Sequence, residues 1–138
     1  MNSFEPAIYS YFGKEKELLT RNFALGETRE LEIPSSGGDY AIISPSFELI
    51  FQQDLLHAVE ICPDDSSGML AGIPYIGDQP VFLGSFLSDL KAGNYAWEID
   101  TKLTGFEYII VISNNVRFDF FIDDHSVSLE FIRPQRPA

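Results

Sequence analysis

The feature that most constrains the fold is a pair of alternating apolar rows near the C-terminus of the 138-residue chain. Each row places an apolar side chain at every second position of a short segment. The first row is Phe106, Tyr108, Ile110 and Ile112, and the second is Val116, Phe118, Phe120 and Ile122. Because successive side chains of a strand point to opposite faces of a sheet, each row lies on one face. The pattern predicts two antiparallel strands joined by a short turn.

The length of that turn decides whether the two rows share a face. A two-residue turn at 114–115 sets Ser113 opposite Val116 and places the rows on opposite faces. A three-residue loop at 113–115 sets Ile112 opposite Val116 and places both rows on one face. Asparagine tolerates the left-handed backbone that such a loop requires, and two asparagines occur here. We therefore predict the three-residue loop and one common apolar face.

The same reasoning extends the sheet in both directions. A four-residue loop at 123–126 follows the second strand, and apolar residues alternate again up to position 131. Before the first strand, apolar and polar residues alternate over 95–100, which indicates a further strand. The sequence thus predicts a four-stranded antiparallel meander over about 95–133. The expected pairs across the second turn are Ile122 with Val127, Phe120 with Leu129 and Phe118 with Phe131.

The rest of the chain is predicted to supply helices and further strands. Apolar spacing, capping residues and turn residues indicate helices over 2–12, 14–25 and 86–92 and strands over 28–33 and 40–43. The segment 47–62 fits either one helix or two strands, and its β-branched and aromatic residues favour strands. We predict a single α+β domain over residues 1–138, with N-terminal helices packed on an antiparallel sheet. No internal repeat is visible in the residues.

The charge is strongly negative and unevenly distributed. The chain carries 21 Asp and Glu against 9 Lys and Arg, which gives a net charge of −12. No Lys or Arg occurs between Arg29 and Lys91, while residues 30–90 contain ten carboxylates. Phosphate binding relies on clustered cations, so the composition argues against nucleic acid and anionic membranes as partners. The acidity fits either solubility alone or a surface built for a cationic partner.

The candidate chemical groups do not form a catalytic or metal-binding pattern. Cys62 is the only cysteine, and the histidines that would have to activate it are His57 and His125. In a strand, His57 and Cys62 lie on opposite faces, and the acidic run at 123–125 has the composition of a turn. We therefore expect no enzymatic activity, no cofactor and no metal.

The expected compartment is the cytoplasm. A single cysteine excludes an internal disulfide and fits a reducing environment. The N-terminal residues lack the basic segment and apolar run of a signal peptide, and no apolar stretch has the length of a membrane span.

The face of the meander opposite the common apolar row is expected to be mixed. Its apolar members are Ile109, Val111, Phe121 and Ile132, and its polar members are Glu107, Arg117, Asp119, Ser128 and Glu130. Helices can cover such a face. Left uncovered, it is a candidate interface, including one with a second copy in a homodimer.

The chain resembles the small bacterial immunity proteins of contact-dependent and polymorphic toxin systems. The shared features are its length, its strong acidity, its single α+β domain and its lack of a secretion signal or catalytic motif. The resemblance implies that the protein binds a basic toxin domain, such as a nuclease, and covers its active site. The surface expected for this role combines the long loop over 63–80 with the turn at 123–126. The residues assigned to it are Asp64, Asp65, Tyr75, Asp78, Asp123 and Asp124.

The order of helices before a long meander also fits a different class, the cone-shaped small-ligand-binding or enzymatic domains that resemble nuclear transport factor 2. This alternative predicts a deep apolar pocket between the helices and the face formed by Tyr108, Phe118 and Phe120. A carboxylate or a histidine would lie inside that pocket.

Overall fold

Strands form most of the regular structure of the computed structural model, which describes residues 8–22, 25, 27–32, 38–44, 47–62 and 80–135. The helical elements are the 3-10 helix η1 (Tyr9–Tyr11), α1 (Lys16–Asn22) and α3 (Leu83–Ala92). The strands are β1 (Arg29–Leu31), β2 (Tyr40–Ser44), β3 (Phe47–Gln52), β4 (Leu55–Ile61), β5 (Glu98–Ile99), β6 (Tyr108–Ser113), β7 (Val116–Ile122) and β8 (Val127–Pro134). The predicted α+β class is confirmed.

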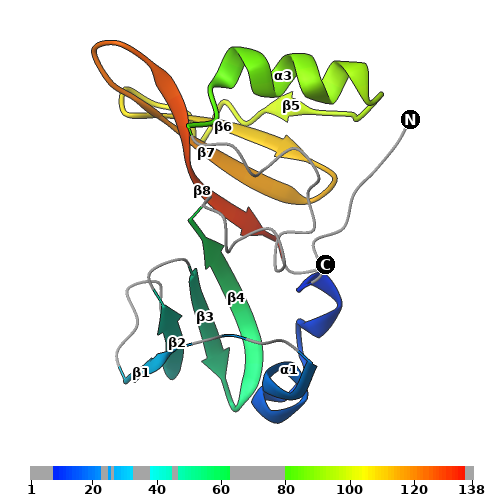
Figure 1. Ribbon diagram of the computed structural model, residues 1–138, viewed down its shortest axis with the longest axis vertical. Coiled ribbons are helices and arrows are strands. Elements are labelled where there is room, and N and C mark those ends of the chain that lie inside the picture. The colour runs from blue at the N-terminus through cyan, green and yellow to red at the C-terminus, as the bar shows by residue number, and fades with distance from the viewer. Residues whose placement is uncertain are drawn as a thin grey trace.

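The eight strands form one antiparallel sheet in the order β1-β2-β3-β4-β8-β7-β6-β5 (Figure 1). The segment 47–62, for which a helix and two strands were both open, forms the hairpin of β3 and β4. Its β-branched and aromatic side chains fit a pleated, half-buried surface better than a helix. The helix predicted over 86–92 is also present as α3, which begins three residues earlier.

The sheet consists of two meanders of the same build, β1–β4 and β5–β8, each preceded by a helix. In both halves the residue just before the helix forms an antiparallel bridge with the last strand. These bridges join Glu15 to Leu55 and Phe82 to Ser128. The N–H of Leu56 bonds to the carbonyl of Lys14 at 2.9 Å, and the N–H of Leu129 bonds to that of Val81 at 2.8 Å.

The hairpins β3–β4 and β7–β8 also correspond at both ends of their registers, although each has its β-bulge at a different position. Phe47 pairs with Ile61, and 71 positions later Phe118 pairs with Ile132. Since β4 and β8 are antiparallel neighbours that pair through Ile61 and Ile132, an approximate two-fold axis runs between them, perpendicular to the sheet. The architecture is repeated although the residues are not: between 47–61 and 118–132 only the first and last residues are identical.

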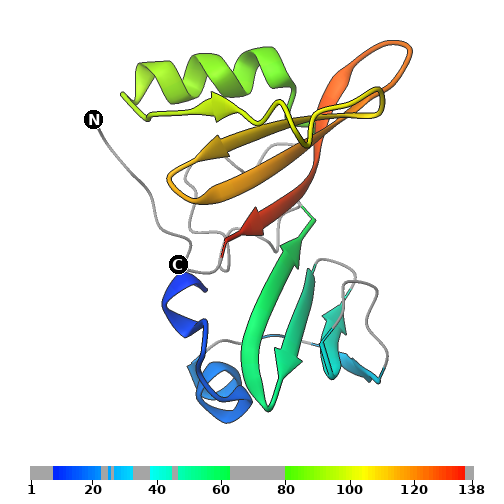
Figure 2. The same ribbon diagram turned by 180° about the vertical axis from the view of Figure 1, so that it is seen from behind.

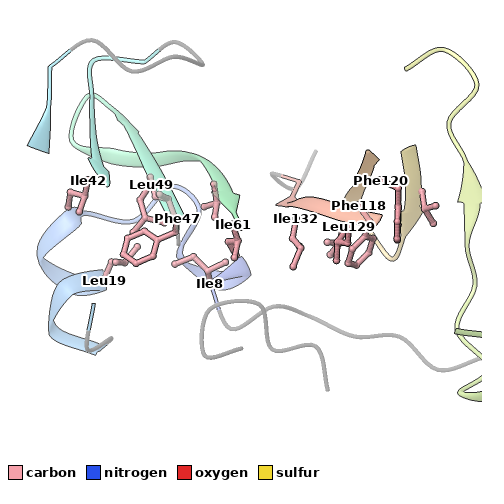
Figure 3. Packing of buried hydrophobic residues seen from close by; sticks show 14 of the residues in the cluster. Ile8, Leu19, Ile42, Phe47, Leu49, Ile61, Phe118, Phe120, Leu129 and Ile132 are labelled. Carbon is pink, nitrogen blue, oxygen red and sulfur yellow. The ribbon is translucent and has the colours of Figure 1, made fainter. Parts of the chain in front are cut away.

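Such an axis keeps the two helices on the same face, and the core lies between them and the sheet. The ring of Phe86 on α3 lies 4.8 Å from that of Phe118 and 5.2 Å from that of Phe120, centroid to centroid. Leu19 of α1 belongs to the same buried cluster, and Figure 3 shows it beside Phe47, the counterpart of Phe118. Each helix therefore covers its own half of one face.

The first turn of the C-terminal meander differs from the prediction. A two-residue turn, Asn114–Asn115, sets Ser113 opposite Val116 and Val111 opposite Phe118. Both asparagines have positive φ, 47° and 64°, which suits the tight turns that match the twist of paired strands. The predicted three-residue loop is wrong because its premise, that only one face buries side chains, does not hold for this sheet.

The second turn follows the prediction close to the loop. Two of the three predicted pairs are confirmed, Ile122 with Val127 and Phe120 with Leu129. A β-bulge next to Asp119 then gives β8 one extra residue, so Phe118 pairs with Ile132 instead of Phe131. The extra residue turns Phe131 and Arg133 away from the helices, and it brings Ile132 into the core.

The two halves meet at a narrow seam between β4 and β8. One pair, Ile61 with Ile132, joins these strands in register, and both side chains are fully buried. Continuing the register by two residues brings Pro134 next to Val59, and both residues line the same groove. Proline has no backbone N–H with which to extend the ladder. The junction therefore depends strongly on its side chains.

Phe86→Ala tests the packing of α3 on the sheet. We expect the free energy of unfolding to fall by about 3–5 kcal/mol, because the change removes a buried ring and leaves a cavity. Phe82→Ala is the matched control, since Phe82 precedes the same helix and has an exposed side chain; its effect should stay within about 0.5 kcal/mol. Urea denaturation measures both, and equal effects would contradict this packing.

Candidate interaction surface

The face of the sheet opposite α1 and α3 is the first candidate surface, and we call it the second face. Alternation along the paired strands assigns its members: Glu48, Ile50, Ala58, Glu60, Tyr108, Ile110, Ile112, Arg117, Asp119, Phe121, Phe131 and Arg133. Ile50 and Ile110 are almost fully buried here, which explains why apolar residues are stable on both faces. Ile109, Val111 and Ile132, predicted for this face, lie on the helix-covered face instead.

An ion-pair network occupies the centre of the second face. Asp119 is buried, and Arg117 binds it with two hydrogen bonds, Nε to Oδ1 at 2.7 Å and Nη2 to Oδ2 at 3.0 Å. Arg133 also donates to Asp119, and it donates to Oε2 of Glu60 from Nη2 at 3.0 Å. Such paired donors compensate for the loss of water around a buried carboxylate.

This network crosses the seam between the two halves. Glu60 lies on β4 and Arg133 on β8, next to the pair of Ile61 and Ile132. The guanidinium of Arg133 also lies 4.9 Å from the centre of the Phe131 ring. These charged side chains thus bind one another, and their ion pairs link β4, β7 and β8.

Two grooves flank Glu60 and open to solvent. The larger, about 420 Å³, is lined by Ile50, His57, Ala58, Val59, Glu60, Arg117, Arg133, Pro134 and Gln135. The smaller, about 230 Å³, is lined by Leu31, Ile43, Ser44, Phe47, Glu48, Glu60 and Cys62. His57 and Cys62 therefore line different grooves. Within the described ranges, no group of three His, Cys, Asp or Glu side chains is arranged to hold a metal ion.

The residues predicted to bind a partner are only partly within the described chain. Asp64, Asp65, Tyr75 and Asp78 lie outside the described residues. Asp123 and Asp124 form the turn between β7 and β8, and both are exposed.

Asp123 has a structural role in this turn. Its Oδ1 accepts the backbone N–H of His125 at 2.7 Å and that of Ser126 at 2.8 Å. These two bonds lower the pKa of Asp123, since they stabilise the ionised form. Asp124 is exposed beside it, so this end of the sheet carries two carboxylates in a turn of fixed conformation.

A second acidic end lies on the N-terminal half, at the turn between β3 and β4. Asp39 accepts the N–H of Gln53 at 2.8 Å, and Asp54 accepts the hydroxyl of Tyr40 at 3.0 Å. Figures 1 and 2 show the β3–β4 and β7–β8 turns at opposite ends of the molecule. The carboxylates of these two turns therefore lie in two separate regions.

The sequence places Arg117 and Asp119, two residues apart on a strand, on one face, and the structure pairs them there. Sequence reasoning missed the other two members of the network, Glu60 and Arg133. Glu60 and Arg133 are 73 positions apart, and they meet because of the β4–β8 pairing and the bulge in β8. No local pattern in the sequence indicates that contact.

Comparisons with protein-family models, with curated proteins and with solved structures find no match. Among the described residues, none of the helices combines the length and the apolar character needed to span a membrane.

Asp119→Ala tests the network. We expect the free energy of unfolding to fall by about 3 kcal/mol, the lower end for breaking a buried pair, because both arginines keep about a quarter of their side chains in water. Asp124→Ala, at an exposed turn, should change it by no more than about 0.5 kcal/mol. If urea denaturation gives the two variants similar values, the network contributes little to stability.

The pKa of Tyr40 tests the acidic N-terminal end. Burial first, and then the hydrogen bond and charge of Asp54, raise this pKa from 10.0 to about 12. The folded value exceeds the unfolded one, so the associated stability is present below pH 10 and is lost as the pH rises through 12. In Asp54→Asn the pKa should fall but stay above 10.0, because burial persists. Ultraviolet titration measures it, and Asp124→Asn, at the other end, should leave it unchanged.

Proposed function

We propose that the protein binds and neutralises a basic toxin domain, such as a nuclease, by covering its active site. The observation that supports this is the net charge of −12 on a scaffold whose exposed turns carry carboxylates at both ends. A nuclease active site is cationic because it binds phosphates. An acidic protein of this size occupies such a site by charge and shape, without chemistry of its own.

The packing of the helix-covered face also supports a binding protein over a cone-shaped ligand-binding domain. Phe86 fills the space above Phe118 and Phe120, where the alternative requires a deep apolar pocket. Tyr108, the third residue of that pocket, lies on the other face. Among the described residues, a packed core therefore occupies the place where the cone-shaped alternative requires a pocket.

The larger groove beside Glu60 is the observation that favours a second candidate, a site for a small ligand. Its volume of about 420 Å³ is suitable for a small molecule, and His57 lines it. A ligand would have to compete with the carboxylates that already bind Arg117 and Arg133. A metabolite that stabilises the protein and no longer does so in His57→Ala would support this candidate.

The direct test of the first candidate is protection of cells. Where the genome encodes a large secreted protein with a cationic C-terminal domain next to this chain, that domain is expressed in a bacterial host, alone and with this protein. We expect growth to stop in the first case and to continue in the second, with a purified one-to-one complex. Growth arrest that persists despite comparable amounts of both proteins would contradict the proposal.

Salt dependence tests the role of charge in that complex. Opposite charges accelerate diffusional encounter, and salt screens them over a Debye length of about 8 Å at physiological ionic strength. We expect the association rate constant to fall at least about tenfold from low to high salt, and the dissociation rate constant to change less. Stopped-flow mixing measures both. A fast association that is independent of salt would rule out electrostatic steering.

A further inference from the structure

We propose that the partner docks on the outer end of the C-terminal half, on a surface that we call the aromatic tip. Its apolar centre consists of Leu103, Phe106 and Phe121, and its acidic rim consists of Glu107, Asp123, Asp124 and Glu130. This inference rests on the proposed function, since it names the contact surface for the same basic partner.

Hydrogen bonds between strands bring the parts of the tip together. Tyr108 pairs with Phe121, and their rings lie 5.5 Å apart. The N–H of Ile122 then bonds to the carbonyl of Glu107 at 2.8 Å, which extends the contact beyond the start of β6. The loop before β6 and the turn after β7 are therefore neighbours, and Phe106 directly precedes Glu107 in that loop.

The exposure of the apolar centre is unusual. The side chain of Phe106 is completely exposed, Leu103 is half exposed and Phe121 is 36% exposed. The position in the N-terminal half that corresponds to Phe121 is Ile50, which is 1% exposed. Clustered exposed apolar side chains with a polar rim are typical of protein interaction sites, and aromatic residues dominate their binding energy.

The loop that carries Phe106 is held in place by its own hydrogen bonds. Asp100 accepts the N–H groups of Lys102 and Leu103 at 2.9 and 3.1 Å. Thr104 accepts the N–H of Ile110 at 3.0 Å, and the N–H of Gly105 bonds to the carbonyl of Tyr108 at 3.0 Å. A loop that is already ordered loses less entropy when a partner binds, so Phe106 is suited to be an anchor.

The charges around the tip define the chemistry of the occupant. Glu107, Asp123 and Asp124 are exposed, and Glu130 accepts the hydroxyl of Tyr108 at 3.1 Å. Lys102 in the same loop offsets one of these four negative charges. The surface therefore fits a basic protein with a hydrophobic cavity for one aromatic ring, and it does not fit an anionic membrane or nucleic acid.

Titration calorimetry with the cationic toxin domain tests the tip, using the full-length protein. Phe106→Ser should raise the dissociation constant at least tenfold, while Leu18→Ser, a control at an exposed leucine of α1, should change it by less than twofold. Circular dichroism should show unchanged thermal unfolding for Phe106→Ser, because its side chain makes no buried contact. A double variant, Glu107→Gln with Asp124→Asn, should slow association severalfold more than Glu17→Gln with Asp89→Asn.

The outcomes separate the tip from the proposed function. Tight wild-type binding that Phe106→Ser leaves within twofold would overturn the tip and leave the inhibitor intact. No wild-type binding to the cationic domain would overturn both. Self-association of the wild type that Phe106→Ser abolishes would assign the tip to a second copy of the chain, and so would overturn the basic partner.

Discussion

The junction between the two meanders is the constraint on which the rest of the structure depends. One registered pair, Ile61 with Ile132, joins β4 to β8 on the helix-covered face, and Pro134 offers no N–H to extend this ladder. On the second face, Arg133 links Glu60 to Asp119. Apolar burial is non-directional, whereas hydrogen-bonded ion pairs fix geometry. The first contact thus holds the halves together, and the second restricts their relative orientation.

The approximate two-fold axis allows corresponding positions of the two halves to be compared, and the cationic side chains are distributed unequally between them. Glu48 and Asp119 occupy corresponding positions, and both are acidic and point to the second face. The C-terminal half supplies Arg117 and Arg133 to its carboxylate, while Cys62 occupies the position that corresponds to Arg133. Glu60 therefore obtains its cation from the other half. The Glu60–Arg133 pair thus adds a charged link across the seam to the buried contact of Ile61 with Ile132.

Sequence reasoning worked where one local rule decided the outcome. The helix ending at Ala92 and the pairing of Ile122 with Val127 each follow from patterns within about fifteen residues. At 47–62 the local pattern favoured strands but left a helix open, and the pairing of β3 with β4 decides between them. It failed at 113–115, because turn length depended on whether the second face is buried, and that is a property of the whole sheet. The bulge at Glu130 and the contact of Glu60 with Arg133 depend on packing between distant strands, which no single segment specifies.

The exposed groups proposed to bind a partner lie far from the groups that stabilise the fold. The β7–β8 turn and the loop before β6 lie at one end of the long axis, whereas the seam lies near the middle (Figure 1). Distant, independent sites contribute additively to stability. Under the proposed function, substitutions at Phe106 or Asp124 alter the binding of the partner without weakening the Asp119 network or the Phe86 core. A scaffold that separates stability from recognition in this way is suited to an inhibitor that must follow changes in its target.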